Sequence, residues 1–215
     1  MFKARLKFEK MLAARYISHL DLMNLIQRSI ARAGLPVWYT EGFNPHAYIS
    51  ILLPLPTGFS GEYELMDFQF TTDEIPPDAV QRLNAAFPAG IRALEIYQPE
   101  MPVRDIAYAE YEICIEAYGL DAGSTAGLFL NGPQMIVKRS KRGEKEVDIN
   151  EFIKSLSAVQ EGDTTRIRAL VAAGNVNLNP EYITGVIREK LPDASILYTN
   201  YHRTAVFNEK MEKFR

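Results

Sequence analysis

Two of the three histidines in this chain lie in one polar stretch, between residues 16 and 58. His19 and Asp21 stand at the start of a predicted helix. A loop rich in turn-forming residues follows the helix and carries four further polar or aromatic side chains, Glu41, Phe43, Asn44 and His46. Imidazole can act as a general base, and an aromatic ring can stack on a nucleobase. Because such side chains on a loop are a usual place for function, the stretch predicts a site for binding or for acid–base chemistry.

The start of the predicted helix has two interpretations. Ser18 is a good N-cap and Asp21 follows three residues later, as in a capping box, so Asp21 has a purely structural explanation. His19 is expected in the first turn, on the apolar side of the helix, as a neutral and partly packed imidazole. A neutral imidazole is also a usable base, so a catalytic or binding role for His19 stays open.

The loop from residue 41 to residue 46 also has two interpretations. A plain hairpin turn explains its glycine, asparagine and proline. It explains Phe43 and His46 less well, because a turn that faces water needs no aromatic side chain. Arg28 and Arg32 are expected on the polar flank of the preceding helix. Together these four side chains would suit a stacked base and a phosphate.

Hydrophobic periodicity predicts an α+β fold with two units. In residues 1–100 the expected order is strand, helix, strand, strand, helix, strand, with elements at 2–8, 18–33, 48–53, 62–71, 76–87 and 91–97. This order is typical of a ferredoxin-like domain, in which helices cover one face of the sheet. Residues 105–215 repeat the scheme irregularly, with a hairpin expected around Lys141-Arg142-Gly143, and the boundary is expected between Pro99 and Pro102.

The first strand places Lys3, Arg5 and Lys7 on one face, which we expect to be open and basic. No aromatic residue shares that face of the strand, unlike the sheet of an RNA-recognition module. Arg203, on the last predicted strand, could contact phosphate or bond to the edge of the sheet.

Charge is distributed unevenly over the 215 residues, whose net charge is −3. Residues 1–50 carry seven Lys/Arg against three Asp/Glu, residues 51–121 three against thirteen, and residues 122–215 fourteen against eleven. The negative net charge argues against a uniformly basic nucleic-acid binder. The pattern fits either an ordinary solvated surface or a basic face for phosphate beside an acidic face for a protein partner.

The single cysteine, Cys114, excludes an internal disulfide and an iron–sulfur cluster held by this chain alone. Glu110, Glu112 and Glu116 share a strand face with it, which we interpret as a water-facing surface, a metal site being the less favoured alternative. The sequence has no zinc-type spacing and no phosphate-binding glycine loop. It also has no signal peptide and no apolar run of roughly 20 residues. We therefore expect a cytoplasmic protein that is not associated with a membrane.

Four segments together resemble the radical-SAM-linked protein family: Tyr16-Ile17-Ser18-His19-Leu20-Asp21, Gly34-Leu35-Pro36, Gly42-Phe43-Asn44-Pro45-His46 and Pro54-Leu55-Pro56-Thr57-Gly58. Tyr201-His202-Arg203-Thr204 looks like the C-terminal strand of that family. This bacterial domain of unknown function occurs beside or fused to radical SAM proteins that carry a cobalamin-binding domain. The resemblance implies an accessory role beside such an enzyme, with no cofactor bound by this chain alone.

These observations lead to the expectation of a cytoplasmic accessory or adaptor protein, rather than an independent enzyme. It would present a structured RNA, of the rRNA or tRNA type, to a radical SAM partner. One alternative is a metal-independent ribonuclease that uses His19 or His46 as general base. The other is a pure protein–protein scaffold, in which RNA has no part.

Overall fold

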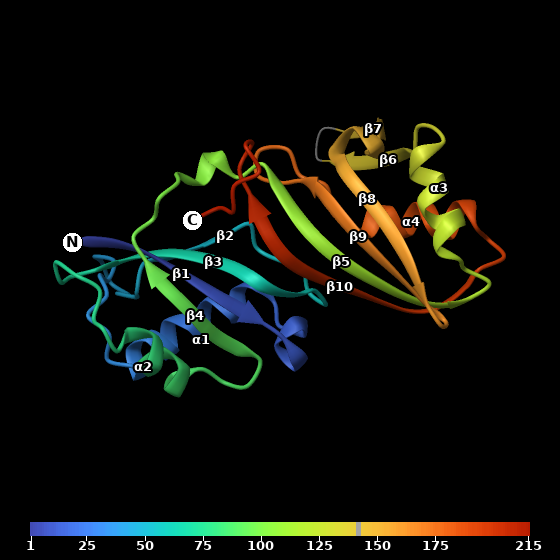
Figure 1. The fold of residues 1–215 in the computed structure, drawn as a ribbon. Coiled ribbons are helices and arrows are strands. Elements are labelled where there is room, and N and C mark those ends of the chain that lie inside the picture. Colours follow the sequence, from blue (N-terminus) through green and yellow to red (C-terminus); the bar gives the residue numbers. More distant parts are fainter. Residues whose placement is uncertain (141–142) are drawn as a thin grey trace. The chain divides into compact units, whose positions relative to one another are not determined.

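The computed structural model describes residues 1–140 and 143–215 and divides the chain into two compact units (Figure 1). The first unit comprises Met1–Asp105 together with Phe214–Arg215, and the second comprises Ile106–Lys213. The expected units, 1–100 and 105–215, differ from this division in two places: residues 101–105 belong to the first unit, and so do residues 214 and 215. Residues 214 and 215 belong to the first unit because Phe214 is fully buried there.

The first unit has the ferredoxin-like order that its sequence predicts. Its elements are β1 (Phe2–Lys10), α1 (His19–Arg32), β2 (Ile49–Leu52), β3 (Ser60–Phe70), α2 (Ala79–Ala86) and β4 (Ile91–Tyr97), with 3-10 turns at Leu12–Tyr16 and Val103–Asp105. The strands lie in the order β4-β1-β3-β2, and each neighbouring pair is antiparallel. The predicted α+β class is therefore confirmed.

Helix α1 begins and ends where its capping residues place it. The Ser18 hydroxyl accepts a hydrogen bond from the Asp21 backbone N–H at 3.1 Å and donates one to the Asp21 carboxylate at 2.7 Å. Gly34, with φ of +60°, follows the last turn, as a C-terminal capping glycine does. The helix packs its apolar stripe of Leu22, Ile26 and Ile30 on the alternate residues of β1 that face the core. The sequence signals at both ends of this helix are confirmed.

The opposite face of the sheet is closed over Arg5, so the expectation of an open basic face is wrong. Arg5 is 1% exposed and bonds the Asp67 carboxylate through Nε at 2.6 Å and Nη2 at 2.9 Å. Its guanidinium also donates to the Met101 carbonyl at 3.1 Å and lies 4.7 Å from the centroid of the Phe214 ring. Segments distant in sequence therefore cover this charge.

Other cations of the first unit are also engaged. The Lys7 ammonium lies 4.1 Å from the centroid of the Tyr63 ring, and Lys10 is buried. Arg15 donates to a backbone carbonyl at 2.8 Å. Lys3 stays exposed. The basic surface predicted from the first strand is consequently much reduced.

The second unit repeats the same order with one insertion. Its elements are β5 (Tyr108–Tyr118), α3 (Ala122–Leu130), β6 (Met135–Ser140), β7 (Gly143–Asp148), a 3-10 turn (Ile149–Phe152), β8 (Ile153–Glu161), β9 (Thr164–Ala172), α4 (Glu181–Lys190) and β10 (Ser195–Phe207). Its strands run in the order β10-β5-β9-β8, while β6 and β7 pair only with each other. The inserted hairpin between α3 and β8 accounts for the irregularity seen in the sequence.

The tip predicted for this hairpin falls partly on residues 141 and 142, which lie outside the described residues. Within the described chain, no helix combines the length and apolarity needed to cross a bilayer.

Candidate functional site

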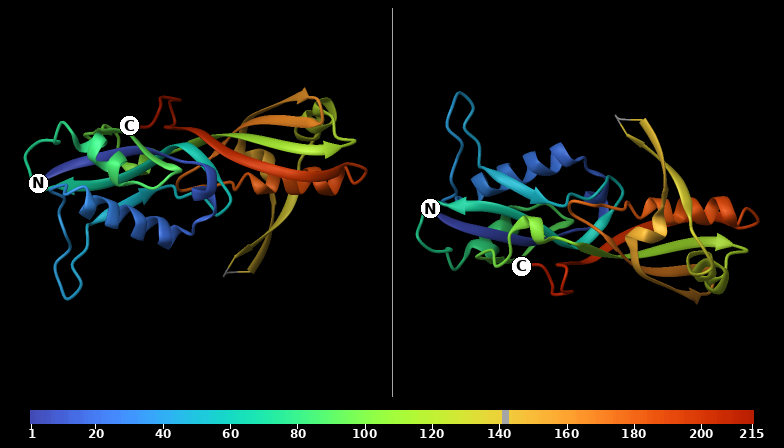
Figure 2. Two further views of the ribbon diagram at one scale, coloured as in Figure 1. Left: turned by 90° about the horizontal axis from the view of Figure 1, so that it is seen from below. Right: turned by 90° about the horizontal axis from the view of Figure 1, so that it is seen from above.

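Residues 38–48 form an arm that projects from the first unit, drawn in light blue in Figure 2. The arm leaves the sheet after Val37, which pairs with β3, and the chain rejoins the sheet at Ile49 in β2. Its two sides pair through Tyr39 and Ala47. The arm is thus anchored to the sheet at both ends and paired across its base.

The tip of the arm presents Phe43, whose exposed fraction is 106%. The turn behind it is built by hydrogen bonds: the Thr40 backbone N–H donates to the His46 carbonyl at 2.9 Å, and His46 Nδ1 lies 3.0 Å from the Asn44 carbonyl. Gly42, with φ of +126°, adopts a backbone conformation that favours glycine. Since a carbonyl only accepts, His46 Nδ1 carries the proton, which leaves Nε2 of the neutral ring as an acceptor or base.

A shallow groove beside α1 gathers three of the residues predicted from the sequence. It has a volume of about 370 Å³ and is lined by Asp21, Asn24, Leu25, Arg28, Arg32 and Pro88. Arg32 donates to the Ala86 carbonyl at 2.8 Å and to the Ser29 hydroxyl at 3.1 Å, so it also ties α1 to the end of α2. Arg28 is exposed and has no hydrogen-bond or ion-pair partner among the described residues. Arg28 is therefore the cation of the groove that is available to a ligand.

The arm and the groove lie on different flanks of α1. Gln27 donates to the Ala47 carbonyl at the base of the arm at 3.1 Å, whereas Arg32 contacts the end of α2. Residues 27 and 32 are five positions apart, which is about 140° around an α-helix. Phe43 and His46 were expected to share one site with the two arginines. In the structure the exposed positions of α1 between these flanks, Asn24 and Ala31, separate the arm from the groove.

The other predicted site residues are placed as follows. Glu41 and Asn44 are exposed on the arm. His19 is exposed as well, instead of partly packed as expected, and it does not line the groove.

Arg203 is 1% exposed, so the predicted contact with phosphate does not fit its position. It lies on the same face of β10 as Tyr201, whose hydroxyl is bonded to Thr184 of α4 at 2.6 Å. That face is the one covered by a helix, and a helix-covered face is not accessible to RNA.

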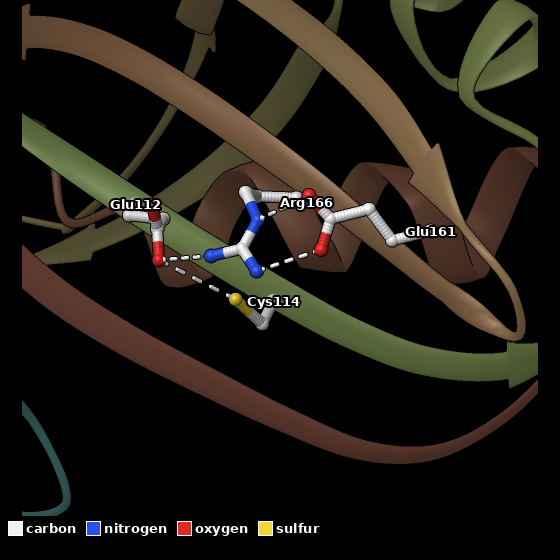
Figure 3. Close-up of polar contacts among 4 residues, drawn as sticks. All are labelled: Glu112, Cys114, Glu161 and Arg166. Carbon is white, nitrogen blue, oxygen red and sulfur yellow. Dashed lines mark hydrogen bonds and ion pairs between the residues drawn. The ribbon is translucent and has the colours of Figure 1, made fainter.

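The exposed face of the second unit's sheet carries a ladder of ion pairs, and Figure 3 shows its part around Arg166. Arg166 bonds Glu112 at 2.5 Å and Glu161 at 2.8 Å. Arg168 bonds both carboxylate oxygens of Glu110, at 2.8 and 2.9 Å. Two of the three predicted strand glutamates are thus paired with arginines of β9, which explains them structurally.

Cys114 lies beside this ladder, and its Sγ is 3.8 Å from the Glu112 carboxylate. Burial and the neighbouring Glu112 carboxylate raise the pKa of its thiol, so the thiolate is disfavoured. Within residues 1–140 and 143–215, no three His, Cys, Asp or Glu side chains are grouped so that they could hold a metal ion.

Acid is expected to destabilise the second unit through Glu110. Burial raises the pKa of this carboxyl, but hydrogen bonds from Arg168 and Thr204 outweigh burial and hold the pKa below its usual 4.5. A pKa that is lower in the folded than in the unfolded protein gives stability that is complete above the unfolded value and is lost as the pH falls through the folded value. Calorimetric unfolding should therefore show the second unit weakening from about pH 5 to about pH 3.

The Glu110→Gln variant should be less stable at neutral pH and lose less stability over that range. Glu116→Gln, an exposed glutamate of the same strand, is the matched control and should follow the wild type. Parallel pH dependences of wild type and Glu110→Gln would contradict the assignment.

Sequence reasoning missed a second cavity, on the sheet face at the base of the arm. It has a volume of about 250 Å³, and Tyr48, Ser50 and Leu52 line one side. Their alternation along an extended segment was the signal that could have placed them on one face.

Comparisons with known proteins give a family and a fold. The family model described as an uncharacterized protein conserved in bacteria (DUF2344) matches residues 3–180. The comparison with curated proteins gives no match. A chain in a crystal structure of a Cbf5-Nop10-Gar1 complex has a TM-score of 0.54 and 13% identity, over 96% of this chain and 50% of that chain.

This chain therefore spans half the length of that structure's chain, and at such identity the likeness concerns the fold alone. A crystal structure of an unknown protein from Galdieria sulphuraria has 10% identity over 92% of this chain and 99% of that chain. Its TM-score of 0.26 is too low to support an argument.

Proposed function

Because this chain belongs to the bacterial DUF2344 family, whose description names no activity, its function must be inferred from its own surface, and we propose that it is an accessory protein that binds a structured RNA. The observation that carries the proposal is Phe43, an aromatic ring held in full contact with water at the tip of an anchored arm. Such a ring gains from stacking on an unpaired base, and every base offers a face for it.

The neighbours of Phe43 support RNA as the ligand. His46 Nε2 can accept a hydrogen bond from a base or a 2′-hydroxyl, because Nδ1 is already committed to Asn44. On the other flank of α1, Arg28 is available for a phosphate. A single strand or loop that stacks on Phe43 would reach Arg28 by crossing the exposed positions Asn24 and Ala31.

A radical SAM protein with a cobalamin-binding domain is the proposed partner. The resemblance of residues 16–58 supports this choice, and the partner would bring its own cluster and cobalamin. Asp73, Glu74 and Asp78, exposed before α2, offer an acidic surface on which it would dock. The proposed compartment is the cytoplasm, where Cys114 would remain a thiol.

The proposal is tested by ultraviolet crosslinking in cells, sequencing of the attached RNA, and measurement of its affinity for purified variants. Phe43→Ala should lower the affinity about 5- to 100-fold, since stacking of one base on an aromatic ring contributes about 1–3 kcal/mol. Arg28→Ala should reduce the slope of log K against log salt concentration by about 1. Leu130→Ala, which removes an exposed apolar side chain from the second unit, is the control and should leave both quantities unchanged. Unchanged affinity in folded Phe43→Ala would refute the proposal.

A protein scaffold is the second candidate, and the sequestered cations favour it. Arg5 and Lys10 are buried, and Lys7 and Arg15 are engaged within the first unit. Little positive charge is then left to attract RNA, while Phe43 could equally enter an apolar pocket of a protein. Pull-down after nuclease treatment separates the two: a scaffold keeps its partner when RNA is removed, and an RNA-bridged complex does not.

A further inference from the structure

The cavity at the base of the arm has side chains from three neighbouring strands of the first unit. Lys3 of β1 stands opposite Gln69 of β3, and Ser50 of β2 stands opposite Asp67 of β3. Tyr48, the last residue of the arm, completes this side. Residues 99–103 of the following segment border the cavity through Pro99 and Val103. The result is a recess of about 250 Å³ with a few convergent polar groups, as ligand sites have.

The charge that this recess offers is positive. Asp67 is neutralised by Arg5, which bonds both of its carboxylate oxygens. Lys3 is exposed at the rim, without a hydrogen-bond or ion-pair partner in the described part of the chain. An anionic group such as a phosphate would be favoured next to Lys3.

One aromatic ring in the recess is accessible. Tyr63 and Tyr97 share this sheet face but are buried under the segment that carries Phe214 and Arg215, as their contacts with those residues show. Tyr48 remains 47% exposed, and Trp38 supports it with ring centroids 5.5 Å apart. The face of β1 has no aromatic residue of its own, as expected, but the neighbouring segments bring these tyrosines to the same sheet face.

We propose that this recess binds one nucleotide, either free or as a unit of an RNA strand. The base stacks on Tyr48, the Gln69 amide and the Ser50 hydroxyl bond its edge, and Lys3 pairs with its phosphate. The recess, of about 250 Å³, lies just under the ~300–1,000 Å³ range of ligand pockets, so it would hold the base, with the ribose and phosphate at its rim beside the exposed Lys3. The RNA form of the ligand rests on the function proposed above, since Tyr48 and Phe43 belong to the same arm. The free-nucleotide form does not.

Tryptophan fluorescence can report binding in the recess, because Trp38 is the only tryptophan of the chain and lies against Tyr48. Purified protein is titrated with AMP, UMP, adenosine and a hexameric uridine RNA, by tryptophan fluorescence and by calorimetry. At least one phosphate-bearing ligand should bind saturably. Tyr48→Ala should weaken it about tenfold or more, while Tyr48→Phe, which keeps the stacking ring, should bind like the wild type.

Two further variants separate stacking from charge. Lys3→Gln should weaken AMP but not adenosine, because adenosine has no phosphate. Tyr39→Ala, which removes an exposed tyrosine of the arm that does not line the recess, should have no effect. Circular dichroism of each variant verifies that it is folded.

The outcomes distinguish the sources of the ligand and the two proposals. Tyr48-dependent binding of AMP or UMP supports a free-nucleotide site, and Tyr48-dependent binding of the hexamer alone supports a unit of RNA. Binding of no ligand, or binding unchanged by Tyr48→Ala, overturns the inference. If Phe43→Ala loses RNA and Tyr48→Ala does not, the recess is refuted and the RNA proposal stands. If cells yield no crosslinked RNA but AMP binds through Tyr48, the RNA proposal is refuted and the nucleotide site in the recess stands.

Discussion

Replacement of Asp67 by alanine is expected to lower the free energy of unfolding of the first unit by about 3–5 kcal/mol. The reason is the burial of its partner: Arg5 is 1% exposed, so the variant leaves a guanidinium charge away from water with no carboxylate. The Met101 carbonyl and the Phe214 ring do not replace a full negative charge. Urea unfolding followed by the fluorescence of Trp38 measures the effect, since Trp38 lies in the first unit.

Two controls isolate the buried charge as the cause. Glu9→Ala breaks the pair with Arg92 on an exposed part of the same sheet and should change the unfolding midpoint little. Replacement of both partners, Arg5→Met with Asp67→Leu, should recover much of the stability, because neither charge then remains. An Asp67→Ala protein as stable as the wild type would show that Arg5 is hydrated in solution.

Phe214→Ala is expected to cost the first unit a similar amount, about 3–5 kcal/mol. Its ring has no exposed surface and covers the guanidinium of Arg5 at 4.7 Å. Removal of the ring leaves a cavity and opens a path for water to Arg5. The same fluorescence assay should show a lower urea midpoint.

The neighbouring Lys213→Ala is the matched control, because that side chain is exposed. Phe214→Leu should fall between the alanine variant and the wild type, since it retains most of the apolar volume. If the tryptophan signal is unchanged in Phe214→Ala while the remainder of the protein unfolds earlier, then residue 214 stabilises the second unit instead, contrary to our assignment.

Much of the fold was predictable because its signals are local. Ser18 and Gly34 mark the ends of α1 through backbone hydrogen bonds and a positive φ, which involve only a few neighbouring residues. The alternation in β1 sorts its residues between two faces. The βαββαβ order of the first unit follows from these elements, and the second unit departs from it by the β6–β7 hairpin.

The candidate site was predictable only in part. Gly42, Asn44 and Pro45 predict a loop, and Phe43 is exposed on it as an unusual residue for a turn. The position of the loop relative to Arg28 was not predictable. It depends on which flank of α1 packs on the arm, and in the structure this is the flank of Gln27, which donates to the Ala47 carbonyl.

The sequence by itself determined where helices, strands and turns begin and which side chains of a strand or helix share a face. The tertiary structure decided which charges meet solvent. Arg5 donates a hydrogen bond to the carbonyl of Met101, which is 96 residues away. The Tyr63 hydroxyl donates to the carbonyl of Phe214, which is 151 residues away. Periodicity reports the direction of a side chain, but burial depends on the segment that covers it. The face of β1 that was predicted to be open and basic is thus closed over Arg5, whereas Tyr48, at the base of the arm, is accessible.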